Sequence, residues 1–226
     1  MKEVNSGKSA ILFGATGLVG NELLKILCAS ERYASVKTFS RRTSGLSNAK
    51  LTELINPLVD PNEISDEIKG DDLFCCLGTT IKKAGSREVF RNIDMELPVT
   101  LAKIAQKNQV KKFIVVSSVG ANAGSRNFYL QTKGEMEKQV SETNIPDIII
   151  VRPSMLLGKR NEFRFGEIMG KAVMKAFSPL LTGKLKKYRG IKAETVAMAM
   201  LNLANANENQ EIFESDELEV WGKDHV

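Results

Sequence analysis

The chain has 226 residues, of which 42% are hydrophobic and 26% are charged, and its formal net charge is +5. This length suits one sizeable domain, and the modest charge comes with no nucleic-acid-binding motif, so we expect no nucleic-acid partner. The single histidine, His225, stands next to the C-terminus. It argues against a Ser-His-Asp hydrolase, a histidine-bound zinc ion and a histidine general base, and we expect no metal site.

Signals for export or for a membrane are also missing. The first ten residues are polar, and no apolar run approaches the roughly 20 residues that span a bilayer. The 3 cysteines do not make a disulfide framework. We therefore expect a cytoplasmic protein without a membrane span.

Short apolar runs alternate with longer amphipathic stretches. The runs that predict strands are 9–14, 35–40, 51–55, 72–78, 112–118 and 147–153. The stretches that predict helices are 17–30, 86–108 and 127–140. Continuous β-branched runs between helices indicate a parallel sheet covered on both faces. The sequence thus predicts a doubly wound α/β fold, the Rossmann fold, with ligands at the carboxyl ends of the strands.

The strand rhythm lapses after residue 153. We expect a single NAD(P)-binding domain over residues 1–226, in which residues 154–226 form a small, largely helical cap on the substrate side. Within this cap, the stretch 163–181 places four apolar residues at helical spacing. They either pack the cap or form an adaptable apolar wall for a bulky substrate, and they are Phe165, Met169, Val173 and Phe177.

A glycine-rich loop, "FGATGLVGNELL", joins the first predicted strand to the first predicted helix. It supplies Gly14, Gly17 and Gly20. Glycines there allow a tight turn and a close approach of the backbone to a pyrophosphate, whose negative charge the helix N-terminus stabilises. The loop predicts a dinucleotide site.

The end of the second strand predicts which dinucleotide binds. A site for NAD places Asp or Glu there, to bond the ribose 2′-hydroxyl. This sequence reads "FSRRTSG", with Arg41 and Arg42 and no acid. A guanidinium can hold a 2′-phosphate through two hydrogen bonds. We expect NADP(H), and the alternative is a pair of solvated arginines.

Each of the 3 tyrosines is followed by a lysine four positions later. Tyr33 and Lys37 fall in an extended segment, where four residues separate them by roughly 13 Å. Tyr188 and Lys192 flank a glycine in a basic stretch without helical pattern, 183–190, which is a solvated loop or meets phosphate or a partner protein. These two pairs are not expected to act together.

The third pair, Tyr129 and Lys133, lies on the predicted helix 127–140, where positions four apart are neighbours. The stripe continues through Met136 and Val140, which are apolar, while Glu137 falls elsewhere. The pair therefore faces the body of the protein. It is either catalytic or buried and inert.

A catalytic role has a chemical basis. A phenol is a poor acid at neutral pH, and an adjacent ammonium stabilises the phenolate and makes proton transfer easier. The same lysine can bond the nicotinamide ribose. A hydroxyl at the end of the fifth strand can orient a substrate carbonyl, and "VVSSVG" offers Ser118, with Ser117 as the alternate.

The glycine loop, Ser118, Tyr129 and Lys133 resemble, in this order, an atypical or extended short-chain dehydrogenase/reductase. The segments "LFCCLGTTIKKAGS", "FYLQTKGEMEKQV" and "VRPSMLLGKRNEFRFGE" make the chain most similar to the Tat-interacting oxidoreductase family, from residue 9 to about 205. The resemblance implies NADPH contacts from Thr16, Gly17, Leu18, Val19, Arg41, Arg42, Leu77, Gly78, Tyr129, Lys133, Leu156 and Arg164. It implies a cofactor and an active site but no particular reaction.

For several further residues the sequence leaves a functional and a purely structural interpretation open. Cys75 and Cys76 suit the core of a central strand better than a redox role. Asn92 is a candidate to support the active site. The stretch 155–170 carries Arg164 and other cations and either orders around the cofactor or stays permanently ordered.

Three functions remain open. The first is an NADPH-dependent reductase of a small carbonyl compound. The second is a non-catalytic NADPH-binding regulator that acts through a protein partner. The third is an epimerase or dehydratase of nucleotide sugars, against which the short cap and the lack of an acid in "SSVGA" both count.

Overall fold

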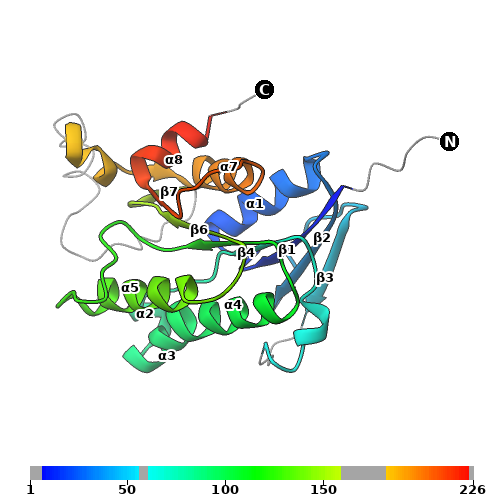
Figure 1. Cartoon of the computed structure of the whole chain (residues 1–226), viewed down its shortest axis with the longest axis horizontal. Coiled ribbons are helices and arrows are strands. Elements are labelled where there is room, and N and C mark those ends of the chain that lie inside the picture. Colours follow the sequence, from blue (N-terminus) through cyan, green and yellow to red (C-terminus); the bar gives the residue numbers. More distant parts are fainter. Residues whose placement is uncertain (1–6, 56–60, 159–181, 224–226) are drawn as a thin grey trace.

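A computed structural model of the chain describes residues 7–55, 61–158 and 182–223. At its centre lies a seven-stranded sheet, in the order β3-β2-β1-β4-β5-β6-β9, with every pairing parallel (Figure 1). Its strands are β1 (Lys8–Phe13), β2 (Tyr33–Ser40), β3 (Leu51–Ile55), β4 (Asp72–Cys75), β5 (Lys112–Val116), β6 (Asp147–Arg152) and β9 (Ile212–Glu214). The predicted parallel sheet is confirmed.

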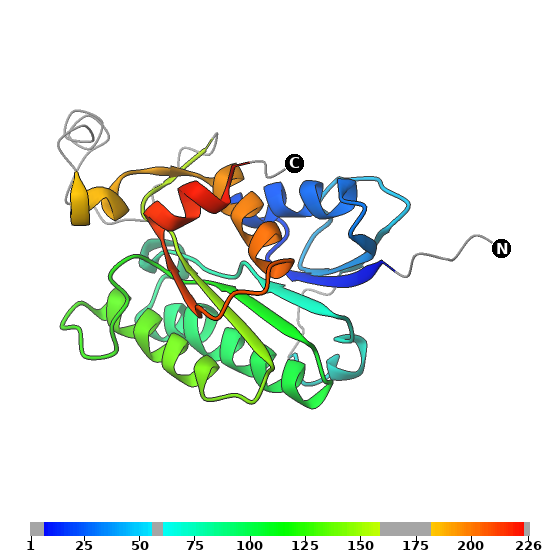
Figure 2. The same ribbon diagram turned by 45° about the horizontal axis from the view of Figure 1, so that its top comes forward.

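Helices cover both faces of this sheet (Figures 1 and 2). One face carries α1 (Leu18–Ala29), α7 (Ala193–Ala204) and α8 (Ser215–Trp221). The other carries α2 (Ile81–Ala84), α3 (Arg87–Arg91), α4 (Leu97–Lys107) and α5 (Phe128–Ser141). Each face has its own buried apolar cluster, so the doubly wound fold is confirmed.

The burial of each strand follows from its place in the sheet. All four residues of β4 and the last four of β5 are buried, because helices cover both of their faces. The edge strand β3 has no fully buried residue. Continuous apolar runs thus mark the central strands, and their carboxyl ends meet at one edge.

Two predicted boundaries differ from the structure. The fourth strand ends at Cys75 rather than at residue 78, so Leu77 and Gly78 belong to a loop. The predicted helix 86–108 is divided: α3 is followed by a π-helical turn, Asn92–Glu96, and only then by α4. Such wide turns inside helices are frequent at functional sites.

The part of the chain after residue 153 also differs from a purely peripheral cap. Strand β9 pairs with β6 as the seventh strand of the main sheet, and α7 packs in the same apolar cluster as α1. A short second sheet pairs β7 (Leu156–Leu157) with β8 (Ile191–Lys192), and a 3-10 helix, η4 (Gly183–Tyr188), precedes β8. The apolar stretch 163–181 lies outside the described residues.

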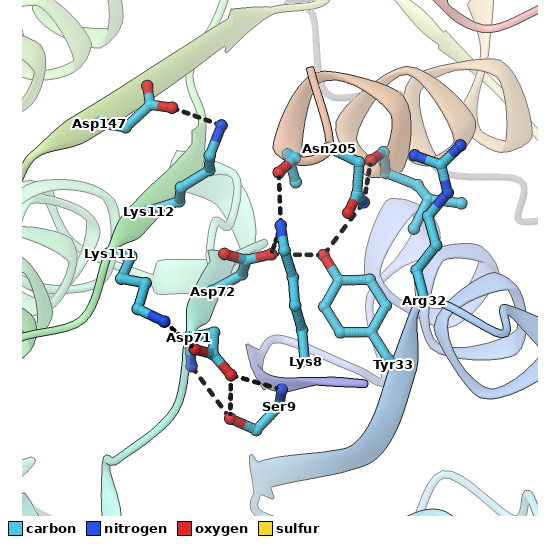
Figure 3. A network of polar contacts seen from close by, with 12 residues as sticks. Lys8, Ser9, Arg32, Tyr33, Asp71, Asp72, Lys111, Lys112, Asp147 and Asn205 are labelled. Carbon is cyan, nitrogen blue, oxygen red and sulfur yellow. Dashed lines mark hydrogen bonds and ion pairs between the residues drawn. The ribbon is translucent and has the colours of Figure 1, made fainter. Parts of the chain in front are cut away.

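A buried polar network closes the amino edge of the sheet (Figure 3). The Tyr33 hydroxyl donates to Asp72 Oδ2 over 2.6 Å, and Lys8 Nζ lies 3.1 Å from the same oxygen. Lys8 also donates to the carbonyl oxygen of Ala204, at the end of α7. Since Asp72 is only 1% exposed, this network fixes α7 against the first residues of β1, β2 and β4.

Candidate active site and dinucleotide cleft

In the glycine loop after β1, two glycine positions have no space for a side chain. Gly14 has φ +86°, and a Cβ there would stand 2.5 Å from the Cys76 carbonyl oxygen. A Cβ on Gly20 would stand 2.2 Å from the Gly14 carbonyl oxygen. The Gly17 N–H donates to that same carbonyl over 2.9 Å. The loop therefore lets α1 approach β1 and leaves bare backbone at the carboxyl edge of the sheet.

A cleft of about 670 Å³ runs along this edge. It gathers residues from the loops after β1, β2 and β4 that the sequence assigned to a dinucleotide, namely Gly14, Thr16, Gly17, Arg41, Arg42, Leu77 and Gly78. Its apolar side includes Phe39, Leu54 and Ile64. A bare glycine loop and an apolar wall suit the phosphates and the adenosine half of a nicotinamide dinucleotide.

Three of the glycine-loop residues assigned to the cofactor do not line this cleft. Val19 and Gly20 are buried in α1, where Val19 belongs to the apolar cluster. Leu18 packs against the same cluster. Val19 and Leu18 thus help to pack α1 onto the apolar cluster, and the contacts of these residues with the cofactor stay a prediction.

A smaller cavity of about 20 Å³, with room for one water-sized group, lies beside the cleft. It brings together Ser118, Tyr129, Lys133 and Leu156 from the predicted set. The remaining lining residues are Thr79, Asp94, Val116, Ser117, Pro153 and Ser154. Thr79 lines both the cleft and the cavity, so the two are neighbours along the carboxyl edge.

Helix α5 places Tyr129 and Lys133 at this cavity. The helix begins after Asn127, whose side chain accepts the N–H of Leu130 over 3.2 Å. A Cβ on Gly134 would stand 2.1 Å from the backbone nitrogen of Ala123, so only glycine lets α5 approach the loop after β5 this closely. The ring of Tyr129 packs 5.6 Å from that of buried Phe90, which fixes the direction of the phenol.

Lys133 is buried against a carboxylate that the sequence analysis missed. Its Nζ lies 2.8 Å from Asp94 Oδ1, and the side chains are 4% and 2% exposed. The other carboxylate oxygen, Asp94 Oδ2, accepts the Thr79 N–H over 2.7 Å. Asp94 thus joins the lysine to the loop after β4. Its position in the π-helical turn could not be read from a regular helical pattern.

Asn92, a candidate to support the site, is exposed and donates from its side chain to Glu96 over 3.4 Å. It does not line the cavity, whereas Asp94, two residues later in the π-helical turn, does.

The two serines after β5 have different partners. Ser117 donates to Glu137 Oε1, and this carboxylate also accepts two hydrogen bonds from Arg152, at 2.9 Å and 2.5 Å. Glu137 is buried, contrary to the expectation that it falls outside the inward stripe of α5. Ser118 is 1% exposed, and its hydroxyl donates a long hydrogen bond of 3.4 Å to the Val119 carbonyl oxygen.

Arg152 extends this contact outward to the C-terminal part of the chain. It bonds Glu214 over 3.2 Å, and Glu214 lies 3.4 Å from Lys187. The hydrogen bonds that Arg152 donates to Glu137 raise the pKa of its guanidinium, which stays charged. Ser117 is therefore engaged in a structural ion network.

The other tyrosines contact residues outside this cavity. Tyr33 bonds Asp72 at the opposite edge of the sheet, and Lys37 pairs with Glu67 at 3.0 Å. Tyr188 is 41% exposed. Cys75 and Cys76 are buried as expected of core residues, and burial raises the pKa of the Cys75 thiol to about 11. Arg164 and the stretch 159–170 lie outside the described residues.

The model of a family described as NAD(P)H-binding matches residues 14–206. The chain belongs to this NAD(P)H-binding family. It is 32% identical over 223 residues to rat protein HTATIP2, covering 96% of this chain and 90% of the relative. The NAD(P)H-binding protein is therefore an atypical short-chain dehydrogenase/reductase related to HTATIP2, as the sequence motifs predicted.

Fungal relatives correct the expected location. The chain is 33% identical to the protein named "FMP52, mitochondrial" of Debaryomyces hansenii, over 87% of this chain and 88% of the relative. Five further fungal relatives carry the same mitochondrial designation. The cytoplasmic location is contradicted by these names, since it rested only on missing signals. None of the helices in the described parts of the chain is long and apolar enough to cross a membrane.

Solved structures share the fold at low identity. WbmG of Bordetella bronchiseptica in complex with NAD superimposes with a TM-score of 0.68 at 12% identity, covering 94% of this chain and 74% of WbmG. MoeE5 in complex with UDP-glucose and NAD superimposes with a TM-score of 0.64 at 15% identity, covering 93% of this chain and 79% of MoeE5. The family and these folds together establish a nicotinamide-dinucleotide-binding architecture.

Proposed function

We propose that this NAD(P)H-binding protein is an NADPH-dependent reductase of a small carbonyl compound. The observation that carries the proposal is the shared cavity of Ser118, Tyr129 and buried Lys133, which adjoins the dinucleotide cleft at Thr79. Tyr129 and Lys133, on the cavity side, would then hold the nicotinamide end of a cofactor bound in the cleft.

Each of the three residues has its own role in the proposed reduction. NADPH, when bound, would supply the hydride that the carbonyl carbon accepts. Tyr129 donates its phenolic proton to the carbonyl oxygen, so the product is an alcohol, and Lys133 stabilises the phenolate that remains. Ser118 donates a hydrogen bond to the same carbonyl oxygen and orients it. Ser117 has no part in this step, because its hydroxyl is bonded to Glu137.

The preference for NADPH rests on Arg41 and Arg42. Both are exposed and line the cleft where β2 ends. Glu67 also lines the cleft, but its carboxylate is paired with Lys37 at 3.0 Å. The two arginines are therefore well placed for a 2′-phosphate, and no carboxylate among the described lining residues is left to select a 2′-hydroxyl.

One observation supports the second candidate, a non-catalytic NADPH-binding regulator. A buried lysine calls for an explanation, and Asp94 provides a structural one by pairing with Lys133 at 2.8 Å. Burial of Lys133 alone is therefore not proof of catalysis. The two candidates differ in turnover and agree in cofactor binding.

A substrate screen tests the proposal. Purified protein is saturated with NADPH and offered separate panels of aldehydes, ketones and quinones, while the loss of NADPH absorbance is followed. The reductase predicts carbonyl-dependent oxidation with at least one panel. Tight NADPH binding without oxidation by any panel would favour the regulator.

A further inference from the structure

The loop that carries Arg41 and Arg42 is held by several side chains. Ser40 Oγ donates to the Arg42 carbonyl oxygen over 2.5 Å. Thr43 Oγ1 accepts the N–H of Gly45 over 3.1 Å, and Gly45 has φ +76°. An exposed turn with these bonds has a defined shape, and this shape determines where the two guanidinium groups can reach.

The strongest anchor of this loop comes from the neighbouring strand. Both carboxylate oxygens of Glu53, in β3, accept hydrogen bonds from the residues directly after Arg42. Oε2 accepts from Thr43 Oγ1 over 2.7 Å, and Oε1 accepts from the Ser44 N–H over 2.8 Å. Hydrogen bonds to a carboxylate are roughly twice as strong as those between neutral groups.

Glu53 acts on the loop and does not line the cleft. The next two residues of β3, Leu54 and Ile55, line the cleft, whereas Glu53 does not. Burial raises the pKa of the Glu53 carboxyl, but the bonds from Ser44 and Thr43 outweigh burial and hold that pKa below its ordinary value. Glu53 is thus charged while it binds the loop.

We propose that Glu53 is a positioning residue that sets the preference for NADPH over NADH by fixing the loop of Arg41 and Arg42. This inference rests on the proposed use of NADPH. Two long arginine side chains lose conformational freedom when they bind a phosphate, and a fixed loop reduces that loss. NADH has no 2′-phosphate, so its affinity does not depend on the loop.

Electrostatic repulsion alone would change the NADPH affinity of a Glu53 variant in the opposite direction. A carboxylate near a 2′-phosphate repels it, so removal of Glu53 would strengthen NADPH binding if repulsion dominated. Positioning predicts weaker binding. The direction of the change therefore separates the two explanations.

The test measures affinity for both cofactors by calorimetry in wild type, Glu53→Ala and Glu53→Gln. We expect Glu53→Ala to weaken NADPH binding about tenfold, the loss of roughly one charge-assisted hydrogen bond, and to leave NADH binding unchanged. Glu53→Gln keeps one acceptor oxygen, replaces the other with an NH2 donor and removes the charge, so it should fall in between. Thr52→Ala, at the exposed position next to Glu53, is the matched control and should bind as wild type.

Thr43→Ala repeats the test at an exposed residue, so that it remains informative if Glu53→Ala does not fold. It removes one of the two bonds to Glu53 and should lower the ratio of NADPH to NADH affinity. An unchanged or increased ratio in these variants would overturn the inference. Equal affinity of wild type for both cofactors would overturn the proposed NADPH preference as well, and that outcome is visible without any variant.

Discussion

Lys133 and Asp94 form an ion pair of 2.8 Å in which both side chains are almost completely buried. The lysine belongs to α5 and the carboxylate to the π-helical turn before α4. Because Asp94 also accepts the Thr79 N–H, one side chain joins three segments that meet at the cavity. The pair couples the stability of the fold to the geometry of the site.

Asp94→Asn should lower the free energy of unfolding by about 3 kcal/mol, because it leaves the Lys133 ammonium buried without a counter-ion. Asparagine can still accept the Thr79 N–H, so the lost free energy of unfolding measures the effect of removing the carboxylate charge. Chemical denaturation measures it. The double variant Asp94→Asn/Lys133→Met removes both charges and should recover most of the loss. If Asp94→Asn is as stable as wild type, the pair contributes nothing to the fold.

Residues that the sequence analysis missed share a physical feature. Asp94, Glu137 and Glu53 each bind a group on a different segment of the chain, so neither helical spacing nor a motif reveals their partners. Asp94 lies in a π-helical turn where the sequence suggests one regular helix, so its direction cannot be predicted from helical spacing. Strand β9 was missed because it has only three residues.

The features that were predicted depend on local pattern. The central strands are continuous apolar runs, and the glycine loop stands between a strand and a helix. The inward stripe of α5 places Lys133, Met136 and Val140 in the interior, as their spacing indicates. These patterns can be recognised in the sequence because the residues that form each one are close together in the chain.

The two serines after β5 should differ in function. Ser118→Ala removes a donor to the substrate oxygen and should lower kcat by about 100-fold. Ser117→Ala removes a bond to Glu137, so it should lower the free energy of unfolding by about 1 kcal/mol and leave kcat close to wild type. Steady-state kinetics and denaturation of both variants check this. A larger loss of kcat in Ser117→Ala than in Ser118→Ala would reverse the assignment.

Tyr33→Phe should destabilise the fold by about 2 kcal/mol at neutral pH, because it leaves the buried Asp72 carboxylate without its closest donor. Burial raises the pKa of Asp72 above its ordinary 3.8, and the Tyr33 hydrogen bond opposes that rise. Without this bond the pKa rises further. A raised pKa in the folded state favours the protonated Asp72 carboxyl. Its contribution to the free energy of unfolding is therefore present below the pKa of Asp72 in the unfolded chain and is lost as the pH increases through the pKa in the folded state.

The deficit of Tyr33→Phe relative to wild type is therefore expected to be largest at neutral pH and to shrink as the pH falls towards about 3.8. Urea denaturation at several pH values measures it. Tyr188→Phe, at an exposed position, serves as the control. A deficit that grows in acid would show that the Tyr33–Asp72 bond is not its source.

Arg41→Ala/Arg42→Ala should weaken NADPH binding by at least about tenfold, because each guanidinium can make a charge-assisted bond to the 2′-phosphate. NADH affinity should stay the same. Lys103→Ala/Lys107→Ala removes the same net charge from exposed positions of α4 and controls for long-range attraction. Equal losses in both double variants would mean that net charge, not contact, favours NADPH.

The most direct test of the reductase compares the turnover of NADPH with a carbonyl substrate in Tyr129→Phe and in Tyr188→Phe. Phenylalanine keeps the ring that packs on Phe90 but has no proton to donate. The account predicts that Tyr129→Phe loses about 10²- to 10⁴-fold in kcat with unchanged NADPH affinity, while Tyr188→Phe turns over as wild type. Wild-type turnover by Tyr129→Phe would contradict the assignment of this cavity as the active site.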